Sequence, residues 1–185
     1  MATERVVIVG AGHAGFQLAA SLRQGGFDGA IMLLGEEPVL PYQRPPLSKD
    51  YLDGKIGLDL LLMRPEAFYR DHRIDYLPGT RAVEIDRVGG QLHLASGEKL
   101  GYDHLVLATG ARNRVPPLPG IELDGVCYLR NLAETDELRQ RLGNERYGDE
   151  RYEEAQIFVR MMEDELSPHR DAVDTLARTL SGAVG

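Results

Sequence analysis

The sequence is poor in cysteine, and Cys127 is the only one in 185 residues. A single cysteine cannot form an internal disulfide, a redox-active dithiol pair or a cysteine-based metal cluster. The five histidines are scattered along the chain, and no two have the spacing of metal ligands. We therefore predict a protein without a metal site.

Excess positive charge and long hydrophobic runs are also missing. The 21 Lys and Arg residues are outnumbered by 29 Asp and Glu residues, giving a formal net charge of −8, which disfavours binding to nucleic acid or to a membrane surface. No apolar stretch approaches the roughly 20 residues that cross a bilayer, and the start "MATERVVIVGAG" does not resemble a signal peptide. We expect a soluble, cytoplasmic protein.

The first third of the chain has the pattern of a βαβ unit. "RVVIV" at residues 5–9 and "AIMLL" at residues 30–34 are short apolar runs typical of buried parallel strands. Between them, residues 14–24 place apolar side chains near a 3.6-residue period, and Gly25-Gly26 ends the expected helix. A right-handed βαβ crossover predicts an α/β fold of the Rossmann-like class.

The pattern then changes twice. A short helix in "PEAFYRDHRI" is expected to lead into a strand at residues 74–77, followed by a small antiparallel meander and a strand at residues 105–108. From residue 143 a charged, glycine-punctuated linker leads to two helical segments, the second opening at Ser167-Pro168. We predict one domain over residues 1–142 and a linker with a helical hairpin over residues 143–185.

The segment "VVIVGAGHAG" contains G-x-G-x-x-G directly after a strand and at the start of a helix. In such a motif Gly10 permits the tight turn, Gly12 lets a pyrophosphate approach the backbone, and Gly15 lets helix and strand pack closely. Ala14 lies in the helical turn whose N–H groups would face the phosphates. Glu36, at the end of the second strand, is placed to accept ribose hydroxyls. The pattern predicts an adenine dinucleotide without deciding which one.

A stiff loop, "LPYQRPPLSKDYL", follows the second strand. Its three prolines restrict φ, so we expect the loop to be held extended and to lose little entropy when a ligand binds. Ser48 is a candidate cap for a short helix. Arg44 and Lys49 would place positive charge at one spot.

Four stretches together resemble the FAD domain of ferredoxin-reductase-like flavoproteins, which include putidaredoxin, rubredoxin and biphenyl-dioxygenase ferredoxin reductases, with apoptosis-inducing factor as a relative. The stretches are "VVIVGAGHAG", "LPYQRPPLSKDYL", "YDHLVLATGARNRVPPLPG" and "YLRNLAETDELRQRL", in the family's order. The resemblance implies FAD as the bound cofactor. It also implies that the proline loop replaces the cysteine pair of disulfide reductases.

The resemblance also implies roles for individual residues. Lys49 would lie beside the flavin ring as the candidate catalytic residue, and with Arg44 it would favour the electron-rich reduced flavin. Thr109 and Gly110 match a second turn that brings backbone close to the flavin.

Two further positions match the family's cofactor contacts. Ala82 matches a residue whose backbone meets the adenine, and Arg130 matches an arginine near the pyrophosphate.

The function implied is electron transfer from NAD(P)H through FAD to a ferredoxin or rubredoxin. Nothing after Leu142 has the strand and glycine pattern of the family's NAD(P)H domain, so that domain is expected to be absent from this chain. Two alternatives stay open: a shortened FAD- or nucleotide-binding module without turnover, or a chain that a partner completes. The helical tail could also form a homo-oligomer, or it could have no evolved role if the chain is an interrupted reading of a longer gene.

Overall fold

The computed structural model describes residues 4–123 and 126–143. The chain divides into two compact units, Met1–Leu138 and Arg139–Gly185, and the account below concerns the first. The predicted helical hairpin lies outside the described residues.

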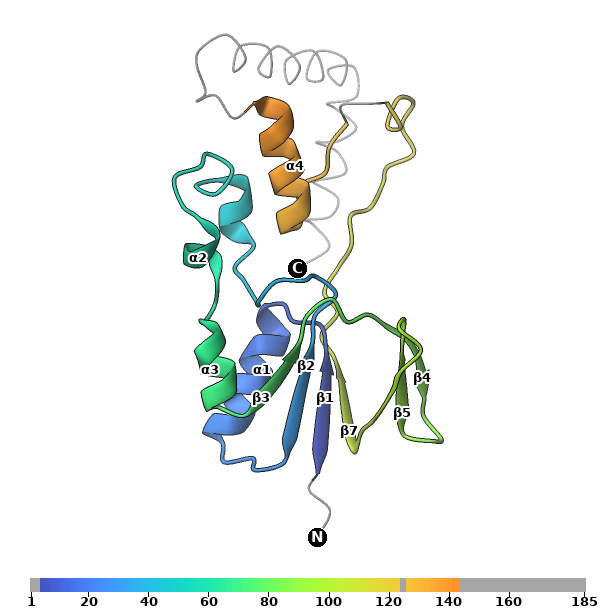
Figure 1. Ribbon diagram of the computed structural model, residues 1–185. Helices are drawn as coiled ribbons and strands as arrows, with labels where there is room; N and C mark the ends of the chain where they lie inside the picture. The colour runs from blue at the N-terminus through green and yellow to red at the C-terminus, as the bar shows by residue number, and fades with distance from the viewer. Residues whose placement is uncertain (1–3, 124–125, 144–185) are drawn as a thin grey trace, which may run out of the picture. The chain divides into compact units, whose positions relative to one another are not determined.

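The first unit is built on a four-stranded parallel sheet with the order β3-β2-β1-β7 (Figure 1). Its strands are β1 (Arg5–Val9), β2 (Ala30–Leu34), β3 (Ile74–Leu77) and β7 (His104–Leu107). β1 pairs in parallel with both β2 and β7, and β2 pairs with β3. The Rossmann-like α/β prediction is confirmed, and only β7 differs from its predicted range, by one residue.

Alternating side chains of the buried strands serve two separate cores. Val6 and Ile8 of β1 pack towards α1 (His13–Gln24) and α3 (Glu66–Asp71), which lie beside one face of the sheet in Figure 1. Val7 packs on the opposite face, in a second apolar cluster. Because successive residues of a strand point to opposite faces, a strand covered on both sides must be apolar throughout. The apolar run in "RVVIV" is therefore explained by a sheet that is covered on both faces, which makes three layers.

The second face of the parallel sheet is covered by the predicted antiparallel meander. Its strands are β4 (Ala82–Asp86), β5 (Gln91–Leu94) and β6 (Lys99–Gly101). Leu92 and Leu94 of β5 are buried against the parallel sheet. The register between β4 and β5 shifts between Ala82 and Glu84, at a bulge.

The proline loop differs from its prediction. Pro45 and Pro46 begin a 3-10 helix, η1 (Pro45–Ser48), whose N-cap is Arg44; Ser48 is its last residue and does not cap its start. Proline's fixed φ suits the first turn of a helix, so two consecutive prolines start a turn here instead of extending the chain. The loop is extended only around Tyr42, which forms an isolated antiparallel bridge with Leu62 just after the short helix α2 (Leu58–Leu61).

Helix α4 (Leu132–Leu142) begins at a capping box that was not predicted. The Asn131 side-chain oxygen accepts a hydrogen bond from the Glu134 backbone N–H at 2.8 Å, and the Glu134 carboxylate accepts one from the Asn131 N–H at 3.4 Å. This reciprocal pair satisfies two donors that a helix start otherwise leaves without partners. The carboxylate also accepts the Arg130 N–H at 2.7 Å, so the chain entering α4 is fixed.

Arg23, near the end of α1, joins the helix to two loops. Its guanidinium donates hydrogen bonds to four backbone carbonyl oxygens, those of Phe27 (2.6 Å), Gly29 (2.8 Å), His72 (2.8 Å) and Arg73 (2.5 Å). Arg23→Ala leaves these carbonyls without that donor, and we expect a loss of about 2 kcal/mol in the free energy of unfolding. Urea denaturation followed by circular dichroism measures this.

Arg70→Ala is the matched control, because the Arg70 side chain is exposed and, within the described part of the chain, its guanidinium pairs with the neighbouring Asp71 alone. Surface ion pairs of this kind contribute little. Equal denaturation midpoints for the two variants would show that the Arg23 hydrogen bonds do not stabilise the fold.

Candidate functional site

A cleft of about 1320 Å³ lies at the carboxyl ends of β1, β2 and β7. The strand order places β2 on one side of β1 and β7 on the other. In open parallel sheets ligands bind at such a switch point, outside the carboxyl ends of the strands. Sites for small ligands typically have about 300–1,000 Å³, so this cleft suits a long ligand such as a dinucleotide.

The three glycines of the motif differ in what a side chain at each position would meet. Gly10 has a φ of +111°, and a Cβ there would lie 2.2 Å from the Ala108 carbonyl oxygen; a Cβ at Gly15 would lie 1.9 Å from the Gly10 oxygen. Both glycines are therefore needed for close packing of β1, β7 and α1. Gly12 has an ordinary φ of −76°, and a Cβ there meets nothing within 4 Å. Gly12 lines the cleft, so its missing side chain leaves room for a ligand.

The start of α1 forms one wall of the cleft. Gly12 is its N-cap, with no side-chain capping hydrogen bond and no acidic residue in the first turn. The first backbone N–H groups of a helix have no intrahelical partner and carry partial positive charge. Ala14 lies in this turn and lines the cleft. This wall is therefore suited to phosphate.

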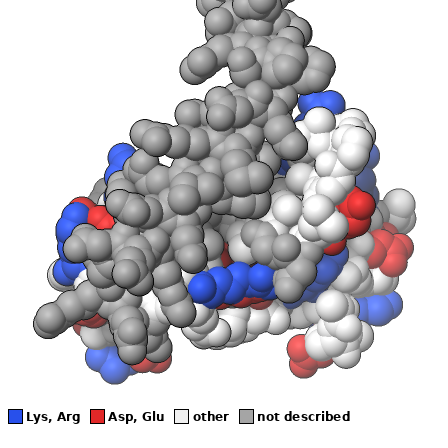
Figure 2. Space-filling view, turned by 90° about the horizontal axis from the view of Figure 1, so that it is seen from above, with Lys and Arg blue, Asp and Glu red and all other residues white. Residues whose placement is uncertain are grey.

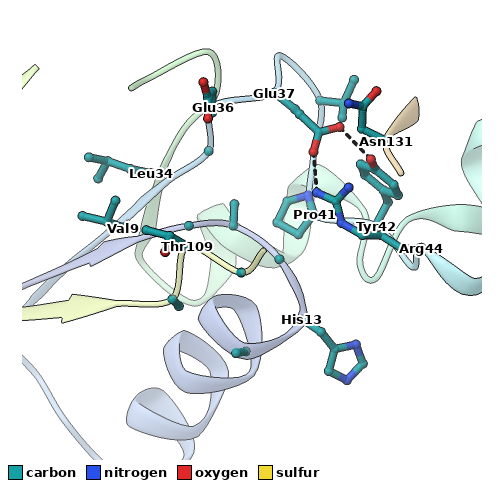
Figure 3. A pocket seen from close by; sticks show the side chains of 18 of the residues that line it. Val9, His13, Leu34, Glu36, Glu37, Pro41, Tyr42, Arg44, Thr109 and Asn131 are labelled. Carbon is teal, nitrogen blue, oxygen red and sulfur yellow. Dashed lines mark hydrogen bonds and ion pairs between the residues drawn. The ribbon is translucent and has the colours of Figure 1, made fainter. Parts of the chain in front are cut away.

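The acidic pair after β2 divides between two environments (Figure 3). Glu36 is exposed. One of its carboxylate oxygens lies 3.3 Å from a guanidinium nitrogen of Arg81, and the other lies 3.8 Å from a guanidinium nitrogen of Arg112. It lines the cleft at the end of β2, where its prediction as the ribose acceptor placed it. Arg81 and Arg112 were not predicted, because charge pairs between distant segments leave no local signal.

Glu37, which sequence reasoning passed over, faces the proline loop. One carboxylate oxygen accepts a hydrogen bond from Arg44 at 2.6 Å, and the other accepts one from the Tyr42 hydroxyl at 2.6 Å. Burial, and then the hydrogen bond to Glu37, raises the pKa of Tyr42 well above its ordinary value. Tyr42 therefore remains a neutral donor at physiological pH. Arg44 also lines the cleft, and Glu37 compensates its charge.

Arg130 also lines the cleft. Its guanidinium lies beside Gly110, 3.9 Å from the position of a Cβ built there. Within residues 4–123 and 126–143, no hydrogen bond or ion pair occupies that guanidinium, whereas Arg44, Arg81 and Arg112 each pair with a glutamate. Viewed from above, basic side chains are visible next to acidic ones at this end of the molecule (Figure 2). Of the four described arginines that line the cleft, Arg130 is thus the one most available to an anionic ligand.

Three other predicted residues also line the cleft: Ala82, Thr109 and Gly110. Ala82 sits at the bulge of β4, and Gly110 has a φ of +69° in the turn after β7. Lys49 does not line the cleft; it is exposed, at the end of η1. His13 lines the cleft at the start of α1 and is exposed, and its ring points away from the other labelled side chains (Figure 3).

Two absences concern the described residues alone. Among them no group of three or more metal-binding side chains is assembled. No helix in the same part of the chain is long and apolar enough to span a bilayer.

The sequence matches known oxidoreductases over most of its length. It is 48% identical over 139 residues to rhodocoxin reductase from Rhodococcus erythropolis, covering 75% of this chain and 33% of that protein. It is 46% identical over 138 residues to rubredoxin-NAD(+) reductase from Pseudomonas putida, covering 74% of this chain and 36% of that protein. The chain spans about a third of the length of these relatives.

Solved structures agree. The ferredoxin reductase for the CYP199A2 system from Rhodopseudomonas palustris has a TM-score of 0.70 at 53% identity, over 75% of this chain and 34% of that one. The covalent putidaredoxin reductase–putidaredoxin complex gives 0.70 at 41% identity, over 77% and 35%. The resemblance to ferredoxin-reductase-like flavoproteins is confirmed.

The family described as "Pyridine nucleotide-disulphide oxidoreductase" matches residues 4–156. Its match includes every strand and helix of the described structure, and the glycine loop, the acidic residue after β2 and the turn after β7 all meet at one cleft. The chain belongs to the pyridine nucleotide-disulphide oxidoreductase family.

Proposed function

We propose that this chain binds FAD in the cleft and serves as the flavin-binding part of an electron-transfer oxidoreductase of the ferredoxin reductase type. The proposal is carried by the surroundings of Gly12. A Cβ built there meets no atom within 4 Å, so the backbone at the start of α1 is open to the cleft at the sheet's switch point. The family and its ferredoxin reductase members use FAD and NAD(P)H.

The residues of the cleft fit the parts of FAD. The N–H groups at the start of α1, including that of Ala14, and the Arg130 guanidinium would hold the pyrophosphate. Glu36 would accept the ribose hydroxyls, with Arg81 and Arg112 orienting its carboxylate. The backbone of Ala82 would meet the adenine, and Thr109 and Gly110 would bring backbone close to the flavin.

Bound flavin supplies the chemistry of accepting a hydride and releasing its electrons one at a time. The residues of this chain bind and orient it. Relatives named as ferredoxin and rubredoxin reductases, and a complex of putidaredoxin reductase with putidaredoxin, support an iron–sulfur or rubredoxin partner and NAD(P)H as co-substrate. Assembly through the tail and a cytoplasmic location remain predictions.

The role of Lys49 rests on the family resemblance. We propose that its ammonium group lies near bound flavin and favours the electron-rich reduced form. Lys49→Met is therefore expected to lower the flavin reduction potential, measured by anaerobic dye-coupled titration. Lys55→Met is the control, because the ammonium group of Lys55 pairs with Asp53 at 2.7 Å and the family resemblance gives Lys55 no role beside the flavin. A potential equal to that of the unaltered chain would assign Lys49 to ordinary solvated charge.

The visible spectrum of the purified chain tests the proposed function, with FAD added where none is retained. A flavin spectrum that bleaches on anaerobic addition of NADH supports a working reductase. A flavin spectrum that persists supports the second candidate, a binding module that needs a partner chain. A chain that neither retains nor binds FAD contradicts both.

A further inference from the structure

Three side chains at one edge of the cleft form a connected group, which we call the Glu37 clasp: Glu37 accepts hydrogen bonds from Tyr42 and from Arg44. Both oxygens of the Glu37 carboxylate are used, each in a contact of 2.6 Å. The Arg44 guanidinium also lies over the Tyr42 ring, 5.3 Å from its centroid. Charge-assisted hydrogen bonds of this length are stronger than neutral ones, so the clasp fixes how Arg44 and Tyr42 are oriented.

The clasp also holds a segment far away in the sequence. Arg44 donates a hydrogen bond of 2.7 Å to the Arg130 carbonyl oxygen, 86 positions along the chain. The Tyr42 hydroxyl accepts a hydrogen bond of 3.0 Å from the Leu132 N–H, which is buried. These two hydrogen bonds hold the backbone at Arg130 and at Leu132, on either side of Asn131, where the capping box of α4 begins. Arg130 is therefore tied to the clasp through its own carbonyl group.

Apolar packing alone cannot give this placement. Tyr42 and Leu132 are buried together in one apolar cluster, which attracts the segment but does not set its register. Directional bonds to two named backbone groups do set it. Among the described residues, the Glu37 carboxylate is the one acceptor that Tyr42 and Arg44 share, so the orientation of both side chains depends on Glu37.

We infer that Glu37 is a positioning residue that acts through Tyr42 and Arg44 to hold the Arg130 guanidinium where it meets the cofactor pyrophosphate. The inference deepens the proposed function and rests on it for the identity of the ligand. It separates the two acids after β2, which both line the cleft: Glu36 is exposed, whereas both carboxylate oxygens of Glu37 accept hydrogen bonds from the proline loop. It also assigns Arg44 to the clasp, so that Arg130 remains the cation for the phosphates.

A double-mutant cycle on FAD affinity tests the inference. Arg130→Gln and Glu37→Gln are each expected to raise the FAD dissociation constant about tenfold. If Glu37 acts by placing Arg130, the second substitution adds little once the first is present. A Glu37 role in general stability predicts that the two effects multiply, and that result would overturn the inference. So would an unchanged affinity in Glu37→Gln. Glu98→Gln is the control, because in the described structure the Glu98 carboxylate accepts its hydrogen bond from Ser96 of the same turn, and Glu98 does not line the cleft.

Amide hydrogen exchange in the cofactor-free chain provides a readout that needs no ligand. Glu37→Gln and Tyr42→Phe are expected to speed exchange at the Leu132 N–H about tenfold, while amides of β1 keep their protection. Unchanged exchange at Leu132 in both variants would overturn the inference. If the unaltered chain fails to bind FAD, the proposed function fails, and the exchange result still decides whether Glu37 holds the segment.

Discussion

Gly12→Val is expected to fold like the unaltered chain and to lose FAD binding altogether. The backbone at Gly12 has a φ of −76°, which valine adopts readily, and a Cβ there meets no atom within 4 Å. The added side chain projects instead into the cleft, in front of the helix N-terminus that would hold the pyrophosphate. FAD binding measured by fluorescence quenching, beside the thermal unfolding midpoint, separates the two effects.

Gly101→Val is the matched control for this variant. Gly101 lies on β6, away from the cleft, and a Cβ there would make only an ordinary contact of 3.7 Å with Arg5. The control should keep both fold and FAD affinity. Retention of FAD by Gly12→Val at the affinity of the unaltered chain would show that the pyrophosphate does not lie against this glycine.

Gly10→Ala, in contrast, is expected to damage the fold itself. The substitution forces alanine into a φ of +111° and places its Cβ 2.2 Å from the Ala108 carbonyl oxygen, where backbone and not a flexible side chain must move. Backbone strain and overpacking each cost about 1–3 kcal/mol, so we expect a loss of roughly 4 kcal/mol in the free energy of unfolding. Chemical denaturation measures it.

Gly12→Ala makes the same change two residues away and should leave the free energy of unfolding almost unaltered, because its Cβ points into open space. Equal free energies of unfolding for Gly10→Ala and Gly12→Ala would mean that β7 can move away from β1 with little loss of stability. The packing argument for Gly10 would then be wrong.

Much of the fold was predictable because its signals are local. The strands β1, β2 and β3 begin and end where "RVVIV", "AIMLL" and "IDYL" do. Glycine follows the first two runs, and Pro78 follows the third. The meander and the parallel sheet followed from periodicity. The prediction of an extended loop was wrong at residues 45–48, where the chain forms a 3-10 helix. The fixed φ of proline, near −65°, is compatible with both an extended chain and a helical turn.

The position of the cleft could be predicted from the sequence, but the hydrogen bonds between its residues could not. The glycine motif and the acid after β2 locate the site, because both follow strand ends that the parallel sheet brings together. The role of Glu37 depends on Arg44 and on backbone groups near residue 131, and no periodicity records such a contact. The Asn131–Glu134 capping box had a readable signal, an Asn followed three residues later by Glu, and was missed.

The placement of β7 beside β1 has a consequence for the order of events during synthesis. The Arg5 backbone N–H donates to Asp103, 98 positions later, and translation at about 5–20 residues per second separates the two by roughly 5 to 20 seconds. Until then a nascent chain presents β1 as the open border of a growing sheet, with the glycine loop formed on one side only. A ligand that contacts both the glycine loop and the turn after β7 can therefore reach its complete site only after the chain near residue 110 has been synthesised.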